Sequence, residues 1–123
     1  MAPPAVHIID DDEAVRDSLA IMLETHGFEV MTYATAQAFL SQAERGVAGC
    51  VITDIQMPEM NGLQLLRAFK ALNMHMPVLV ITARNSRALA GEALAQGARA
   101  VIEKPFAAEV LVQAVRAALD AAA

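Results

Sequence analysis

The sequence predicts an α/β domain in which helices cover both faces of a doubly wound, five-stranded parallel sheet. Five short apolar segments rich in branched residues alternate with five segments whose apolar residues recur at helical spacing. Several of the short segments are nearly continuous in apolar character, as expected for parallel strands covered on both faces. Five successive strand–helix units then require right-handed crossovers, which place helices on both sides of the sheet.

The strands are expected where the apolar segments occur. They read VHII, FEVMT, CVIT, PVLVIT and AVIE, and they occupy residues 6–9, 28–32, 50–53, 77–82 and 100–103. The second segment, FEVMT, has the character of an edge strand, because it is less continuously apolar than the others.

Helices are expected between these strands, over 13–26, in a short segment that follows Thr35, and over 61–72, 86–96 and 107–119. In the first of them the apolar residues follow the i, i+4, i+7, i+8 pattern of a helix with one buried face. Thr35 and Asn61 suit the first position of a helix, and Gly27 suits the end of one. The final stretch, DAAA, is expected to be loosely ordered.

Composition excludes several classes of function. A chain of 123 residues predicts one domain, and a net charge of −5 argues against a nucleic-acid-binding face. No apolar run approaches the roughly 20 residues that cross a bilayer, and the N-terminus lacks the pattern of a signal peptide. The single cysteine, Cys50, is expected to be an inert core thiol. These features predict a cytoplasmic protein that does not bind membranes.

Polar residues gather where the predicted strands end. In open parallel sheets the ligand site lies beyond the carboxyl ends of the strands. The residues found there are Asp10, Asp11 and Asp12 after the first strand, Asp54 after the third, Thr82 after the fourth, and Glu103 and Lys104 after the fifth. Five acids, a hydroxyl and an ammonium group are therefore expected to converge on one edge of the sheet.

Neighbouring carboxylates at this edge require a positive partner. Adjacent strands lie about 4.8 Å apart, so Asp10 or Asp11 would approach Asp54, and ionised carboxylates repel each other at that range. A magnesium ion relieves the repulsion, because it prefers oxygen ligands and keeps waters that a phosphate can displace. With Lys104 and Thr82 beside it, the site suits phosphoryl transfer, in which an aspartate can be the nucleophile.

The motifs of the chain resemble those of the bacterial response-regulator receiver domain. The matching segments are IIDDDE (8–13), VITDIQMPEMNG (51–62), VITA (80–83) and EKPF (103–106), and the resemblance is closest to the FixJ-type branch. It covers nearly the whole chain, so residues 1–123 are expected to form one receiver domain. The resemblance implies the flavodoxin-like, CheY-like fold with strand order 2-1-3-4-5.

The resemblance assigns roles to the acidic residues. Asp54 matches the residue that accepts the phosphoryl group, and it also contributes to the metal site. Asp11 matches the acid that binds Mg²⁺ directly, and Asp10 the one that acts through water. Gln56 would add its backbone carbonyl, while Mn²⁺ or Ca²⁺ can substitute for Mg²⁺. Asp12 is expected to face solvent at the start of the first helix, where a negative charge is favourable.

The resemblance also assigns the remaining site residues. Thr82 matches the hydroxyl that moves on phosphorylation, and Lys104 matches the lysine that binds the phosphoryl group. The Lys104–Pro105 bond is expected to be cis. One position departs from the family, since Val101 stands where many receivers have the aromatic residue that turns inward with the threonine. Output must then depend on backbone shifts around the fourth strand and fourth helix.

The resemblance implies a signalling switch rather than a metabolic enzyme. A sensor histidine kinase or a phosphotransfer protein would supply the phosphoryl group, and the domain would catalyse only its own phosphorylation and slow dephosphorylation. Phosphorylation would reshape the face formed by the fourth helix and the fifth strand. That face would control dimerisation or an output domain, which points to transcription regulation by a longer parent protein.

Other interpretations fit the sequence less well. A haloacid-dehalogenase type of phosphatase would use Asp10 and Asp12, but Ala14 stands where that motif has Thr or Val. An interaction module that is not phosphorylated would have lost a key residue, and a flavodoxin would carry a phosphate-binding loop after the first strand.

The three histidines, His7, His26 and His75, lack the spacing of metal ligands. Arg84 and Arg87 are expected to face solvent or a partner.

Overall fold

A computed structural model describes residues 4–43, 48–55, 57, 60–83 and 87–122. The strands are β1 (Ala5–Ile9), β2 (Val30–Tyr33), β3 (Gly49–Asp54), β4 (Val78–Thr82) and β5 (Ala100–Glu103). The helices are α1 (Glu13–Thr25), α2 (Ala36–Ala43), α3 (Gly62–Ala71), α4 (Arg87–Ala95) and α5 (Ala108–Ala122). Strands and helices alternate throughout, as the sequence predicts.

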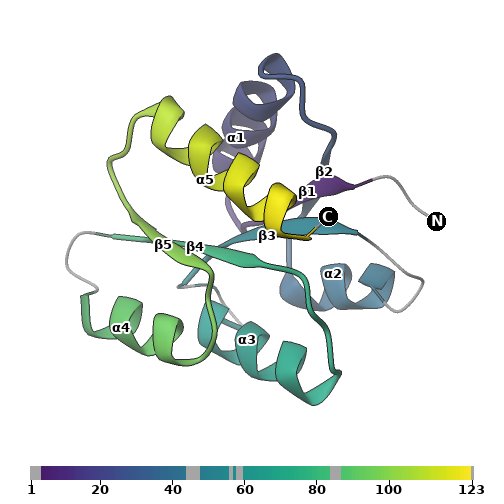
Figure 1. Cartoon of the computed structure of the whole chain (residues 1–123), viewed down its shortest axis with the longest axis vertical. Helices are drawn as coiled ribbons and strands as arrows, with labels where there is room; N and C mark the ends of the chain where they lie inside the picture. Colours follow the sequence, from purple (N-terminus) through teal and green to yellow (C-terminus); the bar gives the residue numbers. More distant parts are fainter. Residues whose placement is uncertain (1–3, 44–47, 56, 58–59, 84–86, 123) are drawn as a thin grey trace.

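The five strands form one parallel sheet in the order β2-β1-β3-β4-β5. Helices α1 and α5 lie on one side of this sheet, and α2, α3 and α4 lie on the other (Figure 1). The predicted fold class and strand order are therefore confirmed, with β2 at an edge. This order makes β1 and β3 neighbours, so the segments that follow them emerge side by side.

Two apolar cores lie on opposite faces of the sheet. The core beside α2, α3 and α4 includes Ile9, Val51 and Val80, packed with Phe39, Leu65 and Phe69. The core beside α1 and α5 is built around Val6, Ile8, Ile52 and Leu79, with Leu23, Leu111 and Val115 from the helices. Cys50 is fully buried in this second core, as predicted for a core thiol, and burial raises the pKa of its thiol to about 12. Alternate residues of the inner strands thus supply both cores.

Local signals explain where the helices begin. Asn61 caps α3 in a capping box, accepting a hydrogen bond from the Gln64 amide while the Gln64 side chain accepts one from the Asn61 amide. The Thr35 hydroxyl oxygen accepts a bond from the Ala38 amide at 3.1 Å, at the start of α2. Both caps were predicted from sequence. The predicted start of the fourth helix at Ser86 lies outside the described residues.

Two boundaries differ from the prediction. Strand β2 begins at Val30 rather than Phe28, because the Phe28 amide bonds to the Leu23 carbonyl in the turn that ends α1. The tail expected to be loose is helical as far as Ala122. Alanine has the highest intrinsic helix propensity, so the Ala-rich end continues α5.

Gly49, the first residue of β3, permits a close approach to β1. Its φ is +120°, and a Cβ atom added there would lie 1.8 Å from the Ala5 carbonyl oxygen. We expect Gly49→Ala to lower the free energy of unfolding by about 3 kcal/mol, from backbone strain together with displacement of β1. Urea unfolding measures this change.

Gly91 in α4 is the matched control for that substitution. A Cβ at Gly91 meets no atom within 4 Å, so Gly91→Ala should stabilise the domain by up to about 1 kcal/mol through helix propensity. An unfolding midpoint for Gly49→Ala equal to that of the native chain would contradict the close approach of β1 and β3.

A buried polar contact joins β1 to β2. The His7 ring lies between the Tyr33 hydroxyl, 2.9 Å from Nδ1, and the Ala48 carbonyl oxygen, 3.1 Å from Nε2. A carbonyl oxygen only accepts, so Nε2 carries the proton and Nδ1 accepts from the Tyr33 hydroxyl. Burial lowers the pKa of His7, against the opposing effect of the Ala48 carbonyl. The histidine thus serves the fold as a neutral ring.

The lowered pKa of His7 predicts a loss of stability in acid. The unfolded chain takes up a proton near its ordinary pKa of about 6.5, whereas the folded chain resists protonation, so the free energy of unfolding falls as the pH drops below about 6.5. The slope from this residue is at most about 1.4 kcal/mol per pH unit. Urea midpoints from about pH 7.5 to pH 5.5 should fall less steeply for His7→Gln than for the native chain. Equal slopes would contradict this role.

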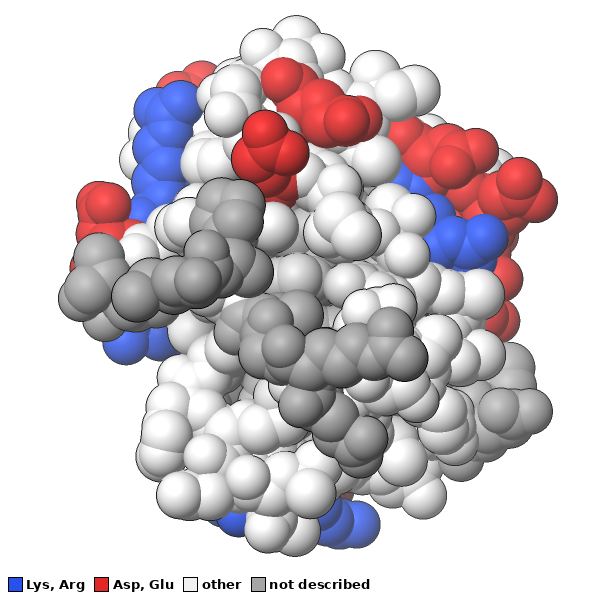
Figure 2. All heavy atoms as spheres, turned by 90° about the vertical axis from the view of Figure 1, so that its right-hand side faces the viewer, with Lys and Arg blue, Asp and Glu red and all other residues white. Residues whose placement is uncertain are grey.

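Charged side chains are unevenly distributed over one face of the domain. On the face drawn in Figure 2, Lys and Arg side chains form separate small groups, acidic side chains lie along its upper part, and most of the lower part is uncharged. In the parts of the chain that the structure describes, none of the helices has the length and apolar character needed to cross a membrane.

Candidate functional site

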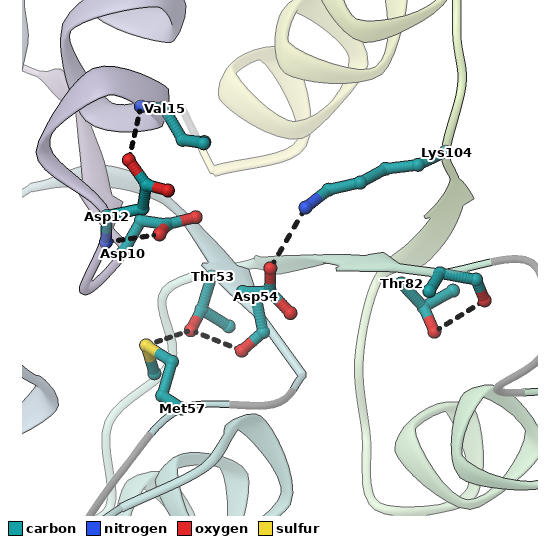
Figure 3. A network of polar contacts seen from close by, with 9 residues as sticks. Asp10, Asp12, Val15, Thr53, Asp54, Met57, Thr82 and Lys104 are labelled. Atoms are coloured by element: carbon teal, nitrogen blue, oxygen red, sulfur yellow. Dashed lines mark hydrogen bonds and ion pairs between the residues drawn. The ribbon is translucent and has the colours of Figure 1, made fainter.

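Four polar side chains predicted from sequence lie at the carboxyl edge of the sheet. Asp10 follows β1, Asp54 ends β3, Thr82 ends β4 and Lys104 follows β5 (Figure 3). The Lys104 ammonium donates a hydrogen bond to Asp54 Oδ2 at 3.1 Å, and the two side chains are 40% and 19% exposed. The edge thus holds a partly buried carboxylate beside an ammonium group and within reach of solvent.

Asp10 is the most deeply buried of the acids, with 5% of its surface exposed. Its Oδ1 accepts a hydrogen bond from the Asp12 amide at 2.8 Å. Burial raises the pKa of Asp10, and the negative charges of Asp54 and Asp11 act in the same direction. The Asp12 amide and the Lys104 ammonium oppose that rise. The carboxylates of β1 and β3 are therefore close enough to interact electrostatically, as the sheet order requires.

The three consecutive aspartates have different environments. Asp12 is the N-cap of α1, since its side chain accepts from the Val15 amide at 3.2 Å (Figure 3). This confirms the helix-start role predicted for Asp12. Asp11 lies between the other two and is exposed, so its carboxylate can reach a ligand from solvent. The sequence DDD thus divides into a buried acid, an exposed acid and a helix cap.

The backbone around Asp54 is held by its neighbours. The Thr53 hydroxyl donates to the Asp54 carbonyl oxygen at 3.1 Å and lies 4.0 Å from the Met57 sulfur (Figure 3). Gly62 closes the loop, since its amide donates to the Ile55 carbonyl and an added Cβ would lie 3.0 Å from Ile55 Cα. These contacts fix the direction in which β3 presents Asp54.

Thr82 and Lys104 are tied together through the backbone. The Lys104 amide donates to the Thr82 carbonyl at 2.8 Å, and the Lys104–Pro105 peptide bond is cis, as the resemblance implies. Thr82 is 2% exposed, and its hydroxyl donates to the Ala83 carbonyl at 3.3 Å (Figure 3). Val101 of β5 lies opposite Val80 of β4 and is half-buried against the core beside α2, α3 and α4.

Sequence reasoning missed one residue at this edge. Arg16 donates from Nη1 to the Asp10 carbonyl oxygen at 2.7 Å, which brings a permanent positive charge to the acidic loop. Its position in the first turns of α1, soon after three acids, is a signal that could have identified it. Gln56 and Arg84, for which the sequence also suggested roles, lie outside the described residues.

The donor set at this edge suits a hard cation. In the described segments of the chain, no three His, Cys, Asp or Glu side chains are grouped closely enough to form a metal site from side chains alone. Mg²⁺ does not need such a cage, because it is commonly bound by one or two carboxylates together with waters and phosphate oxygens. Asp54, Asp11 and Asp10 would supply carboxylates of that kind.

Comparison with known proteins identifies the family. The sequence matches the response regulator receiver domain family over residues 6–116, so the chain belongs to it. Receiver domains are the signalling switches of two-component systems, not classical enzymes, and they generally bind Mg²⁺ at the site of phosphorylation.

The relatives include transcriptional regulators. The chain is 44% identical over 118 residues to transcriptional regulatory protein FixJ of Azorhizobium caulinodans, covering 96% of this chain and 56% of that protein. FixJ of Rhizobium meliloti is 42% identical over 120 residues, with 98% and 59% covered. The chain therefore spans a little over half the length of these relatives.

Solved structures agree with this assignment. The crystal structure of FixJ-N superposes with a TM-score of 0.92 at 42% identity, covering 98% of this chain and 96% of the other. Full-length FixJ from B. japonicum gives a TM-score of 0.90 at 37% identity, covering 99% of this chain and 60% of that one. The chain is thus a FixJ-like receiver domain.

Proposed function

We propose that this domain is a cytoplasmic phosphorylation switch that accepts a phosphoryl group on Asp54 in a Mg²⁺-dependent reaction. The observation that carries the proposal is the Asp54 carboxylate at the end of β3, beside the Lys104 ammonium and next to the acidic loop after β1. The donor would be a phosphohistidine of a sensor kinase or of a phosphotransfer protein. We assign residues 1–123 to this one receiver domain.

Phosphorylation requires a carboxylate nucleophile and charge neutralisation. An Asp54 oxygen attacks the phosphorus, the bond from phosphorus to the donor nitrogen breaks, and the electron pair of that bond stays on the donor. Lys104 binds a phosphoryl oxygen as its contact with Asp54 loosens, because an ammonium group is a mobile point charge. Since Asp12 is engaged as a helix cap, it is poorly placed for the acid–base role that a phosphatase would need.

Three acids and one carbonyl would hold the metal ion. Asp11 and Asp54 would bind it directly, Asp10 would act through water, and Gln56 would contribute its backbone carbonyl. Bound Mg²⁺ supplies positive charge against the negative oxygens of the phosphoryl group. The burial of Asp10 favours its indirect role, because a side chain hydrogen-bonded to the Asp12 amide is directed into the loop.

The response would be carried by Thr82 and the segment that follows it. The Thr82 hydroxyl would leave the Ala83 carbonyl and donate to a phosphoryl oxygen, which shifts the backbone between β4 and α4. Val101 offers no aromatic ring to turn inward, so the shift must reach the surface through α4 and β5 themselves. We propose that this α4–β5 face controls dimerisation or an output domain in a longer transcription regulator.

Intact-protein mass spectrometry after incubation with acetyl phosphate tests the proposal. We expect the native chain to gain the mass of one phosphoryl group when Mg²⁺ is present and to gain none when it is chelated. An adduct that forms equally well without a divalent cation would contradict the metal requirement. A chain that binds Mg²⁺ but forms no adduct with acetyl phosphate or phosphohistidine would contradict the switch itself.

A further inference from the structure

We infer that Arg16 is a positioning residue that fixes the direction of the Asp11 side chain by holding the peptide bond between Asp10 and Asp11. The inference rests on the proposed function in one respect, because it takes Asp11 to be a direct Mg²⁺ ligand. The contacts that support it are hydrogen bonds of the loop between β1 and α1.

Both peptide units that flank Asp11 are held by hydrogen bonds. On one side the Asp10 carbonyl oxygen accepts from Arg16 Nη1 at 2.7 Å, and on the other the Asp12 amide donates to Asp10 Oδ1 at 2.8 Å. Each peptide unit is planar, so one directional bond restricts the orientation of the whole unit. With both units restricted, φ and ψ of Asp11 are set, and so is the direction of its Cα–Cβ bond.

The groups that hold these units are themselves anchored. Arg16 lies in the first turns of α1, where its amide donates to the Asp12 carbonyl at 3.0 Å, and its side chain is half-buried. On the sheet side, the Asp10 amide donates to the Tyr33 carbonyl of β2 at 3.1 Å. The loop therefore connects two fixed elements. Among the described side chains that hydrogen-bond to the backbone of the loop and of the first turn of α1, Arg16 joins Asp10 and Asp12 and brings the positive charge.

The guanidinium suits this task better than a neutral donor. Its bond to a carbonyl is charge-assisted and therefore stronger and shorter than a neutral one, consistent with the 2.7 Å distance. Its planar group is also preorganised, so little freedom is lost when the bond forms. The cationic group also offsets part of the mutual repulsion of the acids.

Two roles for Arg16 predict opposite changes in metal affinity. If Arg16 acted only through its charge, its removal would strengthen Mg²⁺ binding, because one cation would no longer repel another. If it positions Asp11, its removal weakens Mg²⁺ binding, by the 10–100-fold typical of residues that orient metal ligands. The sign of the change therefore separates the two.

The test is calorimetric titration of Mg²⁺ into the native chain, Arg16→Met, Arg16→Lys and the control Arg67→Met, whose arginine pairs with Glu92 between α3 and α4. We expect Kd to rise at least about tenfold in Arg16→Met, to recover largely in Arg16→Lys, and to stay unchanged in Arg67→Met. Without metal, hydrogen exchange at the Asp12 amide should be faster in Arg16→Met. If that variant fails to fold, Arg16→Gln takes its place.

Asp11→Asn separates failure of this inference from failure of the proposed function. An unchanged or lower Kd in Arg16→Met, with a raised Kd in Asp11→Asn, would overturn the positioning role and leave the metal site intact. No effect of Asp11→Asn, or no Mg²⁺ binding by the native chain, would overturn both. When the two substitutions are combined, Arg16→Met should add little to Asp11→Asn, because the side chain that it positions is already altered.

Discussion

Asp54→Asn will abolish phosphorylation by acetyl phosphate and by any phosphohistidine donor. An amide lacks the nucleophilic oxygen of a carboxylate, so no acyl phosphate can form at that position. The side chains have almost the same size, so we expect the sheet and its two cores to remain folded. Mass spectrometry of the treated protein should show an adduct in the native chain and none in the variant.

A surface aspartate provides the control for this loss. Asp17 lies exposed on α1, and Asp17→Asn removes the same charge away from the edge that carries Asp54. We expect Asp17→Asn to be phosphorylated like the native chain. A full adduct in Asp54→Asn, with an unchanged urea midpoint, would show that another residue accepts the phosphoryl group.

Asp11→Ala will remove most of the affinity for Mg²⁺, and with it the phosphorylation at ordinary Mg²⁺ concentrations. We expect Kd for Mg²⁺ to rise more than the 10–100-fold that a residue behind the ligands typically costs, because a direct carboxylate ligand is lost. Stability should change little, since Asp11 is exposed. Calorimetric titration of Mg²⁺ and urea unfolding measure the two effects.

The neighbouring Asp12 is the matched control. Asp12→Ala removes a helix cap rather than a ligand, so it should lower the free energy of unfolding by about 1 kcal/mol and leave Kd for Mg²⁺ nearly unchanged. Adjacent aspartates would then show separate effects, one on metal binding and one on stability. Loss of Mg²⁺ binding in Asp12→Ala with no loss in Asp11→Ala would reverse the assignment.

The fold was predictable because each local signal agrees with the topology. Continuous apolar strands, caps at Asn61 and Thr35, and a glycine after α1 all indicate the same alternation. The start of β2 was harder to predict from the sequence, because Phe28 is apolar yet belongs to the turn that ends α1. The tail was misjudged because alanine repeats suggest both loose ends and helices, and here they extend α5.

The site was predictable in its residues but not in its bonds. Strand ends at Asp10, Asp54 and Lys104 follow from sequence, because parallel strands share an edge. The hydrogen bond from Arg16 to the Asp10 carbonyl does not follow, since it depends on how α1 is oriented against β1. The pairing of His7 with Tyr33 likewise required the register of β1 on β2, which brings two distant polar groups together.

Chemical trapping locates the residue that carries the phosphoryl group. Borohydride reduces an aspartyl phosphate to homoserine, so the phosphorylated native chain is reduced, digested and examined by peptide mass spectrometry. We expect homoserine at position 54 and at no other aspartate position. Homoserine at position 10, 11 or 12, or a phosphoryl group retained on a hydroxyl or imidazole side chain, would contradict it.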